Sequence, residues 1–504
     1  MKKQNLKKHC LLLLSILCLS GTALEMTACA DAGSTAETAD GTAAVTAAES
    51  VTQTETEPEL LPDVPQTDMN GKTIHIFQQD WGTYKPLAIT DITTTDLNGD
   101  VINDAAYNRN LEIEQLLNCT ITTTIDGEYG DGGYNKVLKS IFAGDDTYTF
   151  TLLRVQQYNK LCLSDGFYEL SDIPYIDLSK PWWDSKYAQA VGIMGKAYGA
   201  VSDITMNSYL LAGSVYFNKD MIQTYDLDNP YDLVSAGTWT WDALFTMADE
   251  ADMDLNGDGK YTNEDQYGIT YIDDSPEVLL AAAGVTFAAL DNNGIPQVTL
   301  GTDENMTKIL RLSDLLQDRA ISYNCHARSQ VASDDEAGML VRGKTLFCLG
   351  GLYYAPEMRM MDQDFGIIPY PKYDESQEEY RIPMITVAIT YASVPITNAD
   401  PESTGIFMEN YAYLGHREVM PALYEKLLLG KVSRDDDSAA MLDIIFNNRI
   451  FDTGMIFDFA GLRTNLRVMY HDLKEDFASS IEKNASKVQK NIEALVEEFK
   501  TLEN

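Results

Sequence analysis

The stretch Thr73-Ile-His-Ile-Phe-Gln78 decides the fold, because its β-branched and aromatic residues predict a buried strand. Downstream, apolar residues at helical spacing predict a helix that Asn103 caps and that runs through Leu117. Residues 119–125 predict the next strand. Because strands and helices go on alternating, the sequence indicates an α/β fold with mostly parallel sheets. The other predicted strands cover 147–155, 345–349 and 386–394, and the other predicted helices cover 134–142, 241–252 and the amphipathic stretch 477–499.

The first 29 residues predict export from the cell. Four lysines in the first eight residues precede the apolar run 11–19, which is too short to span a bilayer as a mature helix. Met26-Thr27-Ala28-Cys29 then resembles the bacterial lipobox, in which the Cys is lipidated and becomes the first mature residue. We therefore predict a lipoprotein signal peptide over 1–28 and a lipid anchor on Cys29. Ordinary cleavage near Ala28, with an incidental Cys29, is the alternative.

Residues 29–70 predict a disordered acidic linker. From position 30 onward the segment holds no Lys, no Arg and no aromatic residue. Such a composition cannot bury enough apolar surface to offset the entropy of ordering. A flexible coil of this length has an end-to-end distance of roughly 35 Å. That distance suits a domain, here 71–504, held on the extracellular face of the cell membrane.

The charge balance limits the ligands that the protein can bind. The chain has 37 Lys and Arg against 77 Asp and Glu, a net charge of −40. This argues against nucleic acid, whose binding depends on basic patches. Polyanionic substrates are disfavoured as well, which leaves neutral or cationic ligands. The four cysteines after Cys29 are scattered without a CxxC pair, so they indicate no metal or redox site and leave disulfides open.

One stretch follows the order of a calcium-binding loop. Oxygen-bearing side chains stand at the first, third and fifth positions, Gly at the sixth and a carboxylate at the twelfth. A lone loop of this kind predicts a structural Ca²⁺, and an acidic turn without metal is the alternative. No other cofactor is expected. The candidate metal ligands are Asp254, Asn256, Asp258, Lys260 (through its carbonyl) and Asp265.

Signatures of catalysis are sparse. Residues 338–345 fit the letters of a phosphate-binding loop, but a helix-like stretch precedes them and a strand follows, which is the reverse of the order that phosphate binding requires. The sequence contains neither HExxH nor Gly-x-Ser-x-Gly. A glycosidase with two paired carboxylates stays open, because its acids need no fixed spacing.

From residue 71 to the end, the chain resembles the extracellular solute-binding lipoproteins of carbohydrate ABC importers. No single motif is diagnostic, but several occur in the family's order. They are 102–110, Pro181-Trp182-Trp183-Asp184, 215–219, Gly237-Thr-Trp239-Thr-Trp241, the loop at 256–259, 342–347 and 364–372.

The resemblance implies a periplasmic-binding-protein-like fold, with two α/β lobes joined by a hinge around a ligand cleft. By analogy with maltose-binding protein, lobe 1 would take about 71–212 and 364–420, and lobe 2 about 213–363 and 421–504. The implied protein is a monomer that catalyses nothing. It captures a carbohydrate, most simply an oligosaccharide, by closing its lobes and delivers it to the permease subunits of an ABC transporter.

Sugar binding needs flat aromatic faces for the pyranose ring and polar side chains for its hydroxyl groups. By this reasoning the ligand-binding residues would be Asp80, Trp81, Trp182, Trp183, Asp203, Tyr353 and Tyr354. Trp239 and Trp241 begin a helix, so core packing is favoured for them. Two other functions stay open, namely a surface glycan-active hydrolase and a calcium-binding sensor or adhesion module without a role in transport.

Overall fold

The computed structural model describes residues 60–79, 89–126, 131–328, 336–429, 436–472 and 477–501. Residues 60–504 form one unit. The predicted signal peptide, Cys29 and the linker up to residue 59 lie outside the described residues. Within those residues, no helix has both the length and the apolar character needed to span a membrane.

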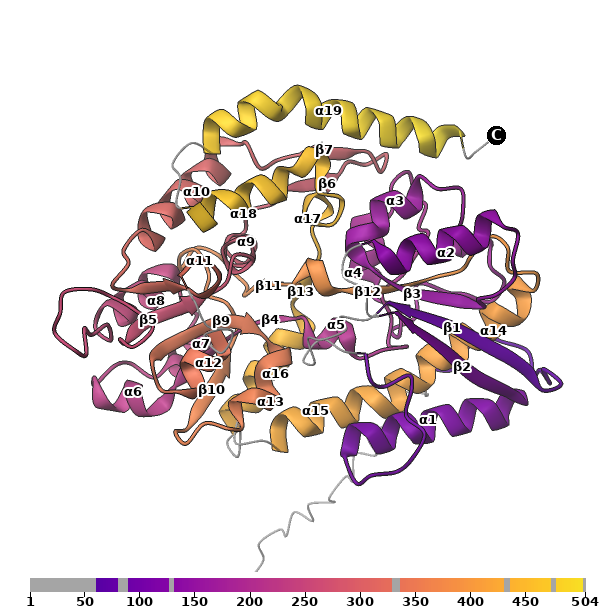
Figure 1. Cartoon of the computed structure of the whole chain (residues 1–504), viewed down its shortest axis with the longest axis horizontal. Coiled ribbons are helices and arrows are strands. Elements are labelled where there is room, and N and C mark those ends of the chain that lie inside the picture. The colour runs from indigo at the N-terminus through magenta and orange to yellow at the C-terminus, as the bar shows by residue number, and fades with distance from the viewer. Residues whose placement is uncertain are drawn as a thin grey trace, which may run out of the picture. The chain divides into compact units, whose positions relative to one another are not determined.

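The first lobe is built on a four-stranded sheet. β1, β2 and β3 run parallel, with Ile74 opposite Ile121 and Ile76 opposite Phe150, and β12 is antiparallel to β3. The spatial order is β12 (Thr390–Ser393), β3 (Phe150–Arg154), β1 (Lys72–Gln79) and β2 (Cys119–Asp126). Helices cover both faces of this sheet (Figure 1): α1 (Val101–Leu117) and α14 (Pro401–Leu414) lie on one, and α2 (Gly132–Phe142) and α3 (Tyr158–Cys162) on the other.

Helix α1 begins earlier than the sequence predicts. Asp100, not Asn103, is its N-cap, and the Asp100 carboxylate accepts hydrogen bonds from the backbone N–H groups of Ile102 and Asn103. An aspartate at this position satisfies amide groups that have no partner within the helix. The ordered chain also begins before residue 71, because the Met69 N–H donates to the Leu117 carbonyl at 2.7 Å. The predicted linker over 29–70 therefore extends too far.

The second lobe is built on a five-stranded sheet in which β5, β8 and β9 are parallel. β4 is antiparallel to both of its neighbours. The order is β10 (Phe365–Ile368), β4 (Gly213–Asn218), β9 (Thr345–Gly351), β5 (Tyr267–Tyr271) and β8 (Ser322–Asn324). Its helices are α6 (Lys219–Thr224), α7 (Pro230–Ala236), α8 (Trp241–Asp249), α9 (Ser275–Ala282), α10 (Asp303–Leu316), α11 (Cys325–Arg328), α12 (Glu336–Val341), α13 (Ala355–Met358) and α16 (Asp436–Asn447).

Three of the segments that lead from one lobe to the other lie side by side. Ala212 bridges to Met384, and the Ile385 N–H donates to the Leu211 carbonyl at 2.9 Å. The third crossing joins them because β11 (Ile382–Pro383) pairs with β13 (Arg449–Ile450). Since β10 belongs to the sheet of the second lobe, the return to the first lobe comes after residue 368. The predicted boundary, at about 364, lies a few residues before this point.

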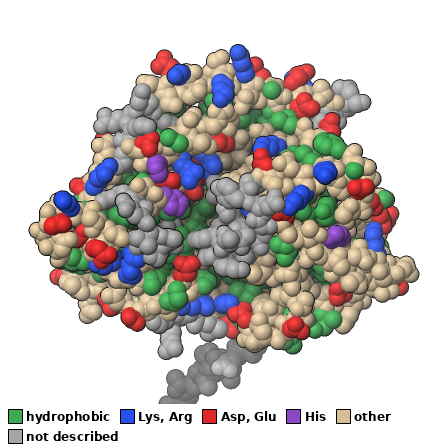
Figure 2. Space-filling model, in the orientation of Figure 1, with side chains coloured by type: hydrophobic (Ala, Val, Ile, Leu, Met, Phe, Trp, Pro, Cys, Tyr) green, Lys and Arg blue, Asp and Glu red, His purple; other side chains and the backbone are tan. Residues whose placement is uncertain are grey.

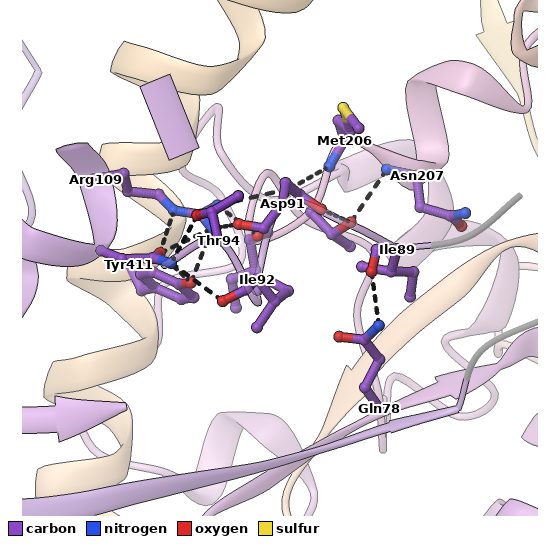
Figure 3. Close-up of polar contacts among 12 residues, drawn as sticks. Gln78, Ile89, Asp91, Ile92, Thr94, Arg109, Met206, Asn207 and Tyr411 are labelled. Carbon is purple, nitrogen blue, oxygen red and sulfur yellow. Dashed lines mark hydrogen bonds and ion pairs between the residues drawn. The ribbon is translucent and has the colours of Figure 1, made fainter. Parts of the chain in front are cut away.

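A buried polar network fixes the first crossing to the first lobe (Figure 3). The Arg109 guanidinium lies 3.7 Å from the Asp91 carboxylate, and neither side chain is exposed. Arg109 also donates to the Ile204 carbonyl and to the Tyr411 hydroxyl, each at 2.8 Å. Asp91 in turn accepts from the Met206 N–H at 3.0 Å. Burial raises the pKa of Asp91, and the Arg109 charge acts against that shift.

The last helices connect the two lobes. α14 passes through a π-helical turn (Gly415–Val419) into α15 (Met420–Leu429), and α17 (Thr453–Phe457) leads by a tight turn to α18 (Leu462–Asp472). α19 (Phe477–Thr501) reaches from one lobe to the other (Figure 1). Near its end, Phe499 packs edge-on against Tyr198 of the first lobe. The smaller elements are α4 (Ser185–Val191), α5 (Asn207–Leu210), β6 (Ala288–Leu290) and β7 (Pro296–Val298).

Candidate functional site

The predicted ligand residues do not gather in one place. Asp80 and Trp81 lie outside the described residues. Trp182 and Trp183 are core residues, because their rings are 1% and 2% exposed and both indole N–H groups donate to the Glu409 carboxylate, at 2.9 and 2.7 Å. Neither ring presents an exposed face in this structure, and the ligand role of Trp182 and Trp183 stays a prediction. Glu409 satisfies two buried donors that would otherwise lack partners.

The other predicted ligand residues are buried as well. Tyr353 and Tyr354 follow β9, at the carboxyl edge of the second sheet, and their exposed fractions are 4% and 2%. A Cβ atom at Gly351 would meet the Tyr353 ring at 2.8 Å, so the absence of a side chain there lets the ring pack closely. Asp203 is 4% exposed and hydrogen-bonds to His416 Nδ1 at 2.7 Å. These three residues support the interior rather than present a ligand surface.

The acidic loop at 254–265 is held by its own backbone. Asp254 accepts from the Gly257 and Gly259 N–H groups at 2.8 and 2.7 Å, and Asp258 accepts from Lys260 at 2.8 Å. The Asp265 carboxylate is buried and accepts from Leu255 and Thr262, and Asn256 accepts from Asp258. The hydrogen bonds that Asp254 accepts from Gly259 and Gly257 lower its pKa, and the bond from Gly259 has the largest effect. No group of three His, Cys, Asp or Glu side chains suited to a metal occurs among the described residues.

A cavity of about 280 Å³ lies where the first lobe, a crossing and the C-terminal helices meet. The first lobe contributes residues that directly follow β3, which is where parallel strands of α/β proteins bind their ligands. Thr386, in the second crossing, and the turn between α17 and α18 complete the wall. The lining residues are Val155, Gln156, Asn159, Lys160, Thr386, Met455, Ile456, Phe457, Asp458, Arg463 and Thr464.

Three lining residues have a buried polar atom without a hydrogen-bond partner in the described chain. These atoms are the Asn159 Oδ1, the Thr386 Oγ1 and the Arg463 Nε. Buried polar groups are nearly always paired, and each unpaired group costs about 1–3 kcal/mol. The three atoms come from three separate parts of the chain and line one cavity. The wall of one cavity therefore contains residues with an acceptor, a hydroxyl and a donor that have no partner in the described chain.

The backbone beside the cavity adopts an uncommon conformation. Asp458 has φ of 42° and Ala460 has φ of 54°, the left-handed region that residues with a side chain seldom occupy. The Asp458 carboxylate offsets part of this cost, because it accepts from the Arg463 N–H at 2.8 Å and from the Thr464 hydroxyl at 2.6 Å. Asp458 thereby holds the first turn of α18 and places Arg463 and Thr464 at the cavity. Strained backbone of this kind occurs often at functional sites.

The charges at the cavity are paired within the protein. Arg463 forms an ion pair with Glu277 at 3.0 Å, and Lys160 pairs with Asp131. Burial raises the pKa of Glu277, and the Arg463 charge acts against that rise. Asp458 is the one carboxylate among the described lining residues, and it is occupied as a helix cap. The cavity therefore suits a neutral polar molecule.

Sequence reasoning did not identify Asn159, Thr386 or Arg463. They lie in three segments far apart along the chain, and none belongs to a recognisable motif. Only the position of Asn159 and Lys160 directly after a predicted strand could have suggested a site, since such loops meet ligands. The other two become neighbours only through the crossing and the turn before α18.

Comparisons with known proteins agree with this architecture. No family model and no curated protein matches the sequence. Among solved structures, the chain is similar to the ABC substrate-binding protein Lmo0181 from Listeria monocytogenes in complex with cycloalternan. Sequence identity is 11%, the TM-score is 0.52, and 84% of this chain and 98% of that chain are covered.

Two further solved structures give similar values. One is the galacto-N-biose-/lacto-N-biose I-binding protein of the ABC transporter from Bifidobacterium longum, with 12% identity, a TM-score of 0.54 and coverage of 85% and 98%. The other is the GacH receptor of Streptomyces glaucescens, with 12% identity, a TM-score of 0.53 and coverage of 85% and 99%. These likenesses concern the fold. They confirm the predicted class, two α/β lobes of periplasmic-binding-protein type.

Proposed function

We propose that the protein captures a neutral carbohydrate in the cavity where the first lobe meets a crossing and the C-terminal helices, and delivers it to the permease of an ABC transporter. One observation carries the proposal: Asn159, Thr386 and Arg463 line one cavity from three parts of the chain, and each has a buried polar atom without a partner among the described residues. A polyhydroxylated molecule can donate to Asn159, exchange a hydrogen bond with Thr386 and accept from Arg463. The solved structures of similar fold include complexes with cycloalternan, lacto-N-biose and maltotetraose.

The geometry couples binding to the hinge. Thr386 lies directly after the crossing that pairs with Ala212, whereas Asn159 belongs to the first lobe. A ligand that hydrogen-bonds to both would hold the lobe and the crossing in one arrangement. Domain closure around a ligand is a common consequence of such a hinge. The bound and open states would then differ in the angle between the lobes.

Catalysis is not part of the proposal. A glycosidase needs two carboxyl groups that flank the bond it cleaves. The described lining residues provide Asp458 alone, and the hydrogen bonds that it accepts at the start of α18 already engage it. We infer that the sugar leaves the cavity unchanged, as transport requires.

We further propose that the protein works outside the cell, anchored by a lipid on Cys29, as a monomer. The basic start, short apolar run and lipobox-like residues 26–29 support this placement. The net charge of −40 favours a permease surface with basic patches. Globomycin, which blocks the lipoprotein signal peptidase, would leave the precursor uncleaved. A Cys29→Ala variant released from the membrane would support the anchor.

The decisive experiment compares stability and affinity in one variant. Removing the unpaired hydroxyl with Thr386→Val should leave the melting temperature of the ligand-free protein unchanged or raise it, since a buried polar group without a partner is lost. The same variant should bind sugar about fivefold to tenfold more weakly, because one hydrogen bond is missing. Ser313→Ala removes another buried hydroxyl without a partner, from a residue that does not line the cavity, and is the matched control.

The ligand itself is found by thermal-shift screening of the purified full-length protein with mono- and oligosaccharides, amino acids and peptides. A ligand at about 100 times its dissociation constant adds about 2.7 kcal/mol to the unfolding free energy. Calorimetry then gives the affinities of the two variants, and chromatography checks the sugar for cleavage. Full affinity in Thr386→Val, or cleavage of the sugar, would contradict the proposal.

A further inference from the structure

One face of α18 carries three polar side chains in a row. Arg463, Arg467 and His471 are four residues apart and therefore lie on the same side of the helix. α18 leads away from the cavity, since Arg463 lines it and His471 lies about 12 Å further along the helix axis. Arg467 and His471 have side chains that are 39% and 42% exposed, so a molecule outside the protein can reach them.

The carboxyl ends of two strands supply the partners of this face. Asp273 follows β5, and its carboxylate lies 2.8 Å from His471 Nδ1 and 3.5 Å from Arg467. Asn324, the last residue of β8, donates to Asp273 at 3.2 Å. His326 follows β8 closely in the chain. Its Nδ1 lies 3.5 Å from the Asp273 carboxylate, and 45% of its side chain is exposed. The carboxyl edge of a parallel sheet is the usual place for ligand contacts.

The network fixes which nitrogen of His471 faces the solvent side. Burial acts to raise the pKa of Asp273, but hydrogen bonds from His326, His471 and Asn324 outweigh it and hold that pKa well below its ordinary value. Asp273 is therefore a carboxylate, which only accepts hydrogen bonds. Because it accepts from His471 Nδ1, that nitrogen carries the proton. In the neutral ring, Nε2 is then an acceptor for a hydroxyl group.

A second cavity of about 270 Å³ lies at the far end of this face. His471 and Asn324 belong to its wall, whereas Arg463, at the other end of the row, lines the first cavity. Its lining residues are Tyr271, Leu316, Arg319, Ser322, Asn324, Ala327, His471 and Asp472. Figure 2 shows histidine side chains beside a group of Lys and Arg side chains, at the edge of a hollow in the face viewed.

We propose that Arg467 and His471 form an outer subsite for an oligosaccharide whose first ring occupies the cavity at Asn159 and Thr386. This inference rests on the proposed function. Arg467 offers donors to ring and hydroxyl oxygens, and His471 offers an acceptor to a hydroxyl. Each cation of the row is paired with a carboxylate, which suits an uncharged chain of sugars. The distance of about 12 Å along α18 between Arg463 and His471 exceeds the length of one pyranose ring. The ligand is therefore an oligosaccharide rather than a monosaccharide.

The test uses ligands of increasing length. Calorimetry measures the affinity of the full-length protein for linear gluco-, galacto- and xylo-oligosaccharides, from the monosaccharide to the hexasaccharide. His471→Asn places an amide near the position of Nδ1, so the hydrogen bond to Asp273 can persist while the outer acceptor is lost. We expect unchanged affinity for the shortest ligand that binds and a fivefold to tenfold loss for the longer ones. His75→Asn, in β1 of the first lobe, is the control variant and should match the wild type.

The outcomes separate this inference from the function on which it rests. If the wild-type protein binds short and long sugars equally well, or if His471→Asn weakens none of them, the outer subsite is refuted and the cavity proposal stands. An equal loss for every length would also refute it, because a general disturbance of α18 would then be the cause. If the wild type binds no saccharide of any length, both proposals fail.

Discussion

Replacing Arg109 by Met tests whether the buried network between the first lobe and the first crossing stabilises the fold as its geometry implies. Methionine retains most of the side-chain length but removes the guanidinium. The Asp91 carboxylate, which is fully buried, then loses the charge 3.7 Å away. Removing one partner of a buried ion pair costs about 3–5 kcal/mol. The Ile204 carbonyl also loses its donor, so we expect a loss near the upper end of that range.

The loss should depend on pH in a defined direction. Without Arg109, burial raises the pKa of Asp91 further, and only hydrogen bonds such as those from the Met206 N–H and the Thr205 hydroxyl act against that rise. A carboxyl group whose pKa is raised in the folded state binds more protons there than in the unfolded chain, so stability falls as the pH rises. The variant should therefore be less destabilised, relative to the wild type, at pH 5 than at pH 8.

Urea unfolding of both proteins, followed by circular dichroism, measures this difference. Arg417→Met is the matched control, because its partner Glu112 and Arg417 itself are 44% and 35% exposed and such pairs contribute about 0–1 kcal/mol. Asp91→Asn added to Arg109→Met removes the uncompensated charge and should restore part of the stability. A loss of unfolding free energy below about 1 kcal/mol at pH 8, or one equal to that of Arg417→Met, would show that the buried network does not stabilise the fold as its geometry implies.

Three further predictions follow from individual contacts. Trp183→Phe removes a donor to Glu409. We expect the free energy of unfolding to fall by about 1–3 kcal/mol, and the melting temperature with it, while sugar affinity stays unchanged. A specific loss of affinity would show that Trp183 belongs to the binding site. The hydrogen bond to Asp203 raises the pKa of His416, so the stability gained from this pair should be lost as the pH rises above the ordinary imidazole value of about 6.5. His416→Gln should flatten the pH dependence of unfolding in that window, and an unaltered profile would contradict the assignment. Calcium binding at 254–265 stays a prediction: CaCl₂ added after EDTA treatment should raise the melting temperature, and Asp258→Asn should weaken this response, whereas an equal response in both proteins would place the ion elsewhere.

Much of the architecture was predictable, because strands and amphipathic helices are local patterns. The first strand, the two strands that follow it in the chain and the long C-terminal helix all lie where the spacing of apolar residues indicates them. Trp239 and Trp241 are fully buried, which confirms the core packing that their position at the start of a helix predicted. The phosphate-loop letters at 338–345 indeed run from a helix into a strand. The exact point at which the chain leaves the second lobe depends on the pairing of β10 with β4, which is not visible in the local sequence pattern.

The candidate site was much less predictable. Aromatic residues were expected to contact ligand because of their chemistry, yet Trp182, Trp183, Tyr353 and Tyr354 pack inside the lobes. Burying a tryptophan ring in the core removes more apolar surface from water than placing it in the exposed wall of a binding site. Burial is possible here because the Glu409 carboxylate accepts from both indole N–H groups. Which aromatics are buried depends on the partners that reach them, and Glu409 is more than 220 residues away in the chain.

The sequence alone determined the acidic character of the chain and predicted its two-lobed α/β fold, since periodicity, composition and the order of short motifs are properties of neighbouring residues. Only the tertiary structure decided which polar groups remain unpaired. Asn159, Thr386 and Arg463 resemble any other polar residue until three distant segments enclose one cavity. The physical reason is that hydrogen-bond satisfaction depends on every group within about 3 Å, and those groups are brought together by folding rather than by sequence.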